Sequence, residues 1–111
     1  MPQAPELTPQ QRAVALEKAA AARSVRARVR AELKAGELSL AELFDRSGSD
    51  QALATMRVTA LLESLPGYGK VRAADLLAEL RIASSRRVRG LGPNQRAALL
   101  ARIERTAQSR I

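Results

Sequence analysis

The sequence predicts an all-α protein with a long N-terminal helix followed by a compact body of short helices. Three observations support this fold class. Capping-box signals recur along the chain, Gly and Pro stand where helices would end or begin, and no stretch alternates apolar and polar residues as a half-buried strand would. The 111 residues suffice for one domain. Since aromatic residues make up only 2% of the chain, Ala, Leu and Val must fill the core.

The first helix is predicted over residues 8–35, after a loose tail at residues 1–7. Thr8 is a favourable N-cap, and Gln11 stands where it can complete a capping box with it. Gly36 supplies the stop, because glycine adopts the left-handed conformation that commonly ends helices. An unbroken helix of this length would extend about 40 Å.

The second half of this helix has two different faces. An apolar stripe is expected to pack on the body and consists of Ala22, Val25, Val29 and Leu33. A basic face lies beside it and consists of Arg23, Arg26, Arg30 and Lys34. Such a pattern commonly means a packing face next to a solvated face, and a second phosphate-contacting surface is the functional alternative. The residues before the stripe are weakly amphipathic, so the front of the helix is expected to stand away from the body.

Short helices are predicted to form the body, residues 37–107. Ser39 and Glu42 make a second capping box, which begins a helix that runs to about Asp45. The later helices are expected, in chain order, at residues 51–55, 56–64, 70–80 and 93–107. In the connector before the last helix, a serine at residues 84–85 is expected to cap a single turn.

The segment Leu65–Arg72 places a Gly-x-Gly turn at the start of a helix. Gly67 and Gly69 allow a ligand to approach the backbone, and the first amides of a helix have no intrahelical partner. Lys70 adds a positive charge, so the turn is predicted to bind phosphate. A tight hairpin turn with a solvent-facing lysine is the structural alternative. The segment is not a nucleotide-binding P-loop, because Val71 follows the lysine.

The turn recurs 23 residues later, where Leu65–Leu80 aligns with Val88–Ile103 and residues 67–69 align with residues 90–92. Three arginines at residues 86–89 precede the second turn, and two side-chain amides follow it. A true repeat fixes the architecture, and we expect the two turns to lie side by side across neighbouring phosphates. Coincidence in an Ala- and Leu-rich chain, with a flexible basic loop at the second turn, is the alternative.

Charge indicates a polyanionic partner. The net charge is +8 and the sequence pI is about 11.4. The charge is uneven, because residues 23–34 and 65–111 are basic whereas residues 35–64 carry more acids than bases. This distribution is typical of separate contact surfaces rather than of a uniformly basic tail.

Several function classes are excluded by composition. The chain contains no Cys and no His, which removes disulfides, Cys- or His-based catalysis and the usual zinc ligands. We therefore expect no enzyme, no metal and no cofactor. No apolar run approaches the roughly 20 residues of a membrane span. No membrane association is expected, and the chain is predicted to be cytoplasmic.

Beyond the two turns, three further segments carry a resemblance to a known family. They are Leu7-Thr8-Pro9-Gln10-Gln11-Arg12, Leu16-Glu17-Lys18-Ala19 and Leu61-Leu62-Glu63-Ser64. Together with Leu65–Arg72 and Ser84–Gly92, they resemble the actinobacterial (mycobacterial-type) integration host factor family over roughly residues 7–103. The resemblance implies a monomeric, nucleoid-associated protein with a helix-two-turn-helix body. It further implies that the protein bends or compacts duplex DNA and assists a phage integrase.

The resemblance also implies where DNA would bind, namely at both turns and under a lid at about residues 46–57. The expected contact residues are Arg57, Pro66, Gly67, Tyr68, Gly69, Lys70, Val71, Arg72, Arg86, Arg87, Arg89, Gly90, Leu91, Gly92, Asn94 and Gln95. Contacts of this kind reach the phosphate backbone, so little sequence preference is expected. Two alternatives stay open: an RNA- or ribosome-binding protein with the same module, and a helical adaptor that docks its long helix on another protein.

Overall fold

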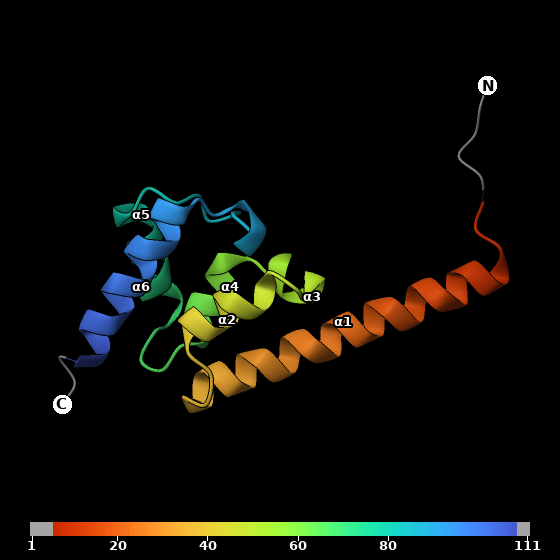
Figure 1. The fold of residues 1–111 in the computed structure, drawn as a ribbon, viewed down its shortest axis with the longest axis horizontal. Helices are drawn as coiled ribbons and strands as arrows, with labels where there is room; N and C mark the ends of the chain where they lie inside the picture. The colour runs from red at the N-terminus through yellow and green to blue at the C-terminus, as the bar shows by residue number, and fades with distance from the viewer. Residues whose placement is uncertain (1–5, 109–111) are drawn as a thin grey trace, which may run out of the picture.

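The computed structural model describes residues 6–108, and within them the protein is helical with no β-strand. Helix α1 (Pro9–Ala35) forms one long rod, and the shorter helices gather beside its C-terminal half (Figure 1). The predicted fold class is confirmed. Of the predicted tail, residues 1–5 lie outside the described residues, and residues 6 and 7 are exposed.

Both ends of α1 form as predicted. The Thr8 hydroxyl accepts a hydrogen bond from the Gln11 backbone N–H at 3.1 Å, and the Gln11 side chain accepts one from the Thr8 N–H at 2.9 Å. At the other end, Gly36 adopts φ 77° and donates to the Leu33 carbonyl at 3.2 Å. These local bonds satisfy backbone groups that a helix terminus would otherwise leave unpaired.

Only the second half of α1 packs on the body. Val29 and Leu33 are buried, and Ala22 and Val25 are half-buried, as the apolar stripe predicts. By contrast, every residue from 6 to 18 is exposed, so the front of the rod stands away from the other helices (Figure 1).

The short elements follow in a compact cluster. They are α2 (Leu40–Ser47), α3 (Gln51–Ala54), α4 (Val58–Ser64), α5 (Lys70–Glu79), the 3₁₀ helix η1 (Val88–Gly90) and α6 (Pro93–Gln108). The capping box of Ser39 and Glu42 is present at the start of α2, which ends two residues later than expected. Asp50 caps α3 by accepting a hydrogen bond from the Ala52 N–H.

Leucine dominates the core. The largest fully buried side chains are Leu33, Leu43, Leu53, Leu61, Leu62, Leu77, Leu99, Val58 and Val88. Alanine contributes less than the composition led us to expect, since Ala73 is the one alanine in the described core. Both aromatic residues, Phe44 and Tyr68, are buried in it. Helix α4 lies between α1 and α5 and contacts both.

Helix α4 begins at Val58, two residues later than predicted. The Val58 N–H donates to the Arg86 carbonyl at 3.0 Å, and the Met56 carbonyl accepts from the Val88 N–H at 3.0 Å. An isolated antiparallel β-bridge therefore joins Arg57 to Arg87. The expected helix start at residue 56 was wrong because this backbone is extended and pairs with a distant segment. We call this pairing the bridge.

The expected turn at residues 84–85 forms, and the Arg86 N–H donates to the Ala83 carbonyl at 3.0 Å, but no hydrogen bond from either serine side chain caps it among the described residues. The Ser84 carbonyl instead accepts a hydrogen bond from the Thr59 hydroxyl at 2.7 Å, which holds the connector against α4. The short helix in this region is η1, and no side chain caps its start.

The 23-residue repeat is confirmed in the backbone. In each copy, the N–H of the middle turn residue, Tyr68 or Leu91, donates to the carbonyl three residues earlier at 3.1 Å. The carbonyl of the second glycine, Gly69 or Gly92, then accepts the first hydrogen bond of the following helix at 3.0 Å. Helices α5 and α6 consequently begin at equivalent positions of the repeat.

The two turns nevertheless differ in conformation and do not lie side by side. Gly67 has a left-handed φ of 78°, whereas its counterpart Gly90 lies within η1 and has no positive φ. The first turn follows the C-terminus of α4, and the second adjoins the bridge at its N-terminus. Helix α4 thus separates them (Figure 1), so the expectation that they lie side by side was wrong.

We predict that the α2 capping box contributes pH-dependent stability. The Ser39 backbone N–H, with help from the Ser39 hydroxyl and the Arg46 charge, lowers the pKa of Glu42. A lowered folded-state pKa stabilises the protein above the unfolded pKa, and this contribution disappears as pH falls through the folded value. Glu42→Gln keeps the hydrogen-bond acceptor and should be less stable than the parent at about pH 7 but equally stable at about pH 2. Urea unfolding at both pH values measures this, and a pH-independent difference would contradict it.

The two glycines of the first turn should respond differently to alanine. Gly67→Ala should lower the free energy of unfolding by about 1–2 kcal/mol, because a Cβ is unfavourable at a positive φ. Gly69 has φ −109° and no atom within 4 Å of an added Cβ. Gly69→Ala should therefore change stability by less than about 0.5 kcal/mol. Thermal unfolding compares the variants, and equal losses would exclude this account of the turn.

Candidate nucleic-acid interface

The start of α5 is open to a ligand. Its N-cap is Gly69, and no side chain caps it. The first backbone hydrogen bond of the helix runs from the Ala73 N–H to the Gly69 carbonyl. The N–H groups of residues 70–72 therefore have no partner within the helix. Lys70 is exposed at the first helical position. Free amides, the positive helix end and a cation suit a phosphate oxygen.

Arg72 stabilises this turn from within. Its guanidinium donates to the Gly67 carbonyl at 3.1 Å and lies over the Tyr68 ring, 4.5 Å from the ring centre. Tyr68 is only 9% exposed, so its side chain belongs to the core and its predicted contact is limited to the main chain. Arg72 therefore holds the left-handed turn in place as well as adding positive charge.

The start of α6 is less open. The Gln95 side-chain oxygen accepts a hydrogen bond from the Gly92 N–H at 3.0 Å, and Pro93 has no N–H to offer. The Gln95 oxygen thus caps the turn, while its side-chain NH2 group can still donate to a ligand. Leu91 is buried and, like Tyr68, can offer only its backbone. The second turn consequently offers fewer backbone N–H groups than the first, since only those of Asn94 and Gln95 precede the first helical bond, from the Arg96 N–H to the Gly92 carbonyl.

Arg86 stabilises the second turn in the same way that Arg72 stabilises the first. Its guanidinium donates to the Gly90 carbonyl at 3.2 Å. Gly67 and Gly90 are equivalent in the repeat, so each first glycine has its carbonyl held by an arginine. Because a bare carbonyl would repel a phosphate, these bonds make both turns more favourable for an anion.

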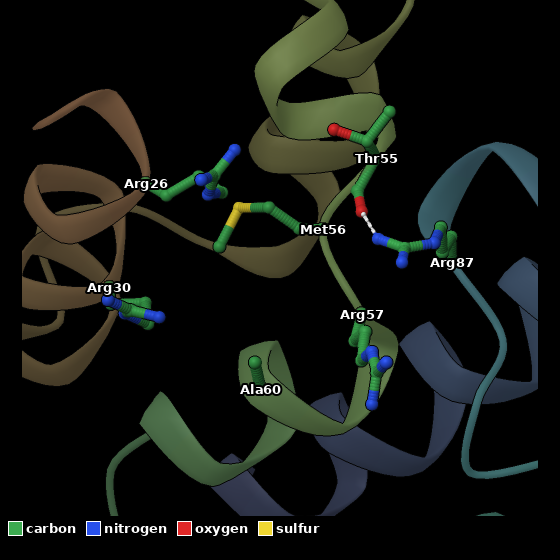
Figure 2. A pocket seen from close by; sticks show the side chains of 7 residues that line it. All are labelled: Arg26, Arg30, Thr55, Met56, Arg57, Ala60 and Arg87. Carbon is green, nitrogen blue, oxygen red and sulfur yellow. Dashed lines mark hydrogen bonds between the residues drawn. The ribbon is translucent and has the colours of Figure 1, made fainter. Parts of the chain in front are cut away.

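Four arginines from distant parts of the chain surround one cleft. They are Arg26 and Arg30 of α1, and Arg57 and Arg87 of the bridge (Figure 2). The Arg87 guanidinium donates to the Thr55 carbonyl at 2.6 Å. We call this space the arginine cleft. Only half of the predicted basic face of α1 lines it, because Arg23 and Lys34 are exposed elsewhere on the helix.

The remaining predicted contacts lie on the surface. Pro66, Arg89 and Asn94 are exposed, and Val71 is 76% exposed beside Lys70. The segment expected as a lid, residues 46–57, forms the end of α2, helix α3 and the bridge. Since Leu53 and Met56 within it are buried, it is an integral part of the body.

Sequence reasoning missed the side chains that hold the second turn. Arg96 donates to the Val88 carbonyl at 3.1 Å and lies over the Phe44 ring. Thr59 binds the connector, as described above. No local pattern could have identified these residues, because their partners are remote in sequence or are main-chain atoms.

The described residues hold no group of His, Cys, Asp and Glu side chains that could ligate a metal ion. Within the same part of the chain, none of the helices has both the length and the apolar character needed to cross a membrane.

Comparison with known families gives a match over most of the body. The family model described as the S13-like H2TH domain matches residues 33–103. The chain is also similar to proteins named integration host factor. The Mycobacterium tuberculosis relative is 52% identical over 89% of this chain and 94% of its own length. The Streptomyces coelicolor relative is 56% identical over 86% of this chain and 89% of its own length.

A solved structure shares the architecture. It is described as sIHF bound to an 8-bp palindromic DNA, is 51% identical in sequence and superposes with a TM-score of 0.75. The match covers 78% of this chain and 97% of that chain. The helix-two-turn-helix body, the repeated turns and these extensive similarities lead to one conclusion: the chain belongs to the integration host factor family.

Proposed function

We propose that this protein is a non-enzymatic, architectural protein that binds duplex DNA through its phosphate backbone with little sequence preference. The observation that carries the proposal is the DNA-bound relative, whose fold this chain shares at 51% identity. The high positive charge and the open start of α5 support it from this chain's own chemistry. As a nucleoid-associated protein, it would act wherever chromosomal DNA is folded.

The proposed contacts fall into two groups. At the first turn, the amides of residues 70–72 and the Lys70 ammonium bind one phosphate, while Arg72 keeps the turn rigid. At the second turn, the side chains of Arg86, Arg87, Arg89 and Asn94 provide most of the contacts, because fewer backbone N–H groups are open there. None of these contacts requires a base edge, which accounts for low sequence preference.

Separated contact surfaces suit a protein that changes the path of DNA. The two turns lie at opposite ends of α4, which is about 10 Å long. A straight duplex need not present phosphates at both positions, so binding can be coupled to bending or compaction. We propose that the protein acts in this way as a monomer and assists site-specific integration by bringing DNA segments into position for a phage integrase.

Gel-shift titrations of the full chain against duplex DNA, duplex RNA and single strands test the proposed polymer. Duplex DNA should bind most tightly, and two unrelated DNA sequences should bind about equally. If five or six phosphates are neutralised, a plot of log K against log salt should slope at roughly −4.5 to −5.5. Tighter binding of duplex RNA would favour the RNA-binding alternative, and a flat salt response would exclude backbone recognition.

Substitutions in the first turn should distinguish the contribution of the backbone N–H groups to DNA binding from that of the Lys70 charge. Lys70→Ala should weaken DNA binding about tenfold and make the salt slope shallower by about 1. Gly69→Val should weaken binding further, because the added side chain points into open space where the phosphate would approach the amides.

Ala13→Val serves as a control for added bulk, since Ala13 is exposed on the front of α1, away from the turns. Circular dichroism and thermal unfolding establish that each variant is folded. If folded Gly69→Val protein bound DNA with parental affinity, the amides of the turn would play no part in recognition.

A further inference from the structure

The arginine cleft has the character of a binding site in its own right. It has a volume of about 320 Å³ and is lined by Arg26, Arg30, Arg57 and Arg87 together with Thr55, Met56 and Ala60. Figure 2 shows Arg26 and Arg30 reaching in from α1, opposite the two arginines of the bridge. No residue of either Gly-x-Gly turn lines the cleft, although Arg87 is shared with the DNA contacts proposed beside the second turn.

The cleft contains no compensating negative charge. None of its lining residues is acidic. Among the described residues, Arg26, Arg30 and Arg57 form no ion pair, and Arg87 bonds only to a neutral carbonyl. By contrast, Arg28 on the same helix forms an ion pair with Glu32, four residues later. Four like charges around one space repel each other, and an anion between them would remove that repulsion.

Size and geometry indicate a ligand with several phosphates. Guanidinium groups bind phosphate through paired, planar N–H donors, and here they approach from two opposite sides. The cleft volume of about 320 Å³ far exceeds the roughly 10–15 Å³ that one water needs on the same measure, so the cleft can admit a group larger than a single ion. Four guanidinium groups carry more positive charge than the roughly one to two negative charges of a single phosphate can balance.

We propose that the arginine cleft is a second phosphate site that takes two or more closely spaced phosphates. The phosphates could belong to a free polyphosphate or nucleoside polyphosphate, or to a nucleic-acid backbone. The chemistry of recognition is the same for these sources. Because Arg26 and Arg30 come from α1 and the other two arginines from the bridge, the bound group would also link the long helix to the body.

Calorimetric titration of the full chain with sodium tripolyphosphate tests the proposal directly. We expect saturable binding with one tight site in the arginine cleft, tighter than the binding of a single phosphate group at the first turn. The double variant Arg26→Gln/Arg30→Gln should weaken it about tenfold or more, because two charged hydrogen-bonding partners are lost. The matched control is Arg23→Gln/Lys34→Gln, which removes the same charge from the same helix outside the cleft and should change affinity by less than about twofold.

Absence of saturable binding, or equal weakening in the two double variants, would overturn the proposal, since the second result indicates diffuse attraction to a basic helix. All four positions are on α1 and none is in the core, so circular dichroism should show folded protein throughout.

A competition experiment identifies the source of the phosphates. If duplex DNA displaces tripolyphosphate, the site serves the nucleic-acid backbone; if both bind together, it serves a free polyphosphate. Gly69→Val keeps this result separate from the proposed function. That variant should bind tripolyphosphate normally even if it no longer binds DNA, and loss of both ligands in a folded Gly69→Val protein would count against a distinct cleft site.

Discussion

The pairing of the chain before α4 with the chain before η1 is the constraint on which the site depends. Two backbone bonds at 3.0 Å form the bridge between Arg57 and Arg87. The bond from the Thr59 hydroxyl to the Ser84 carbonyl and the bond from Arg87 to the Thr55 carbonyl reinforce it. Without this pairing, the second turn would lose its attachment to the chain before α4 and the arginine cleft would lose one wall.

The basic side chains of this protein have two roles: some hold the backbone in place, and others are available to bind a ligand. Arg72, Arg86 and Arg96 each donate to a main-chain carbonyl and so hold the two turns in shape. Among the described residues, Lys70 and Arg89 form no ion pair and remain available to a ligand. Structural arginines near a phosphate site still contribute to its potential, because their positive charge persists when they bind a carbonyl. Net charge alone therefore overstates how many side chains contact a ligand.

Local sequence patterns predicted those features whose causes are local. The capping boxes at Thr8 and Ser39 form because each needs only bonds between residues three positions apart. The 23-residue repeat was visible for the same reason, since each turn is built from a few successive residues. The start of α4 was predicted incorrectly and the attachment of the connector to α4 was not predicted, because both depend on bonds to residues about 25 to 32 positions away.

By itself, the sequence determined the all-helical class, the extent of α1, the two glycine turns and an excess of positive charge, since each follows from neighbouring residues or from composition. Only the tertiary structure decided that the turns lie apart on either side of α4, that Tyr68 and Leu91 face the core, and that half of the α1 basic face meets the bridge. The physical reason is that these outcomes depend on how the buried leucines pack α4 against α1 and α5. Packing between distant segments, unlike a helix cap, leaves no signal at a fixed spacing along the chain.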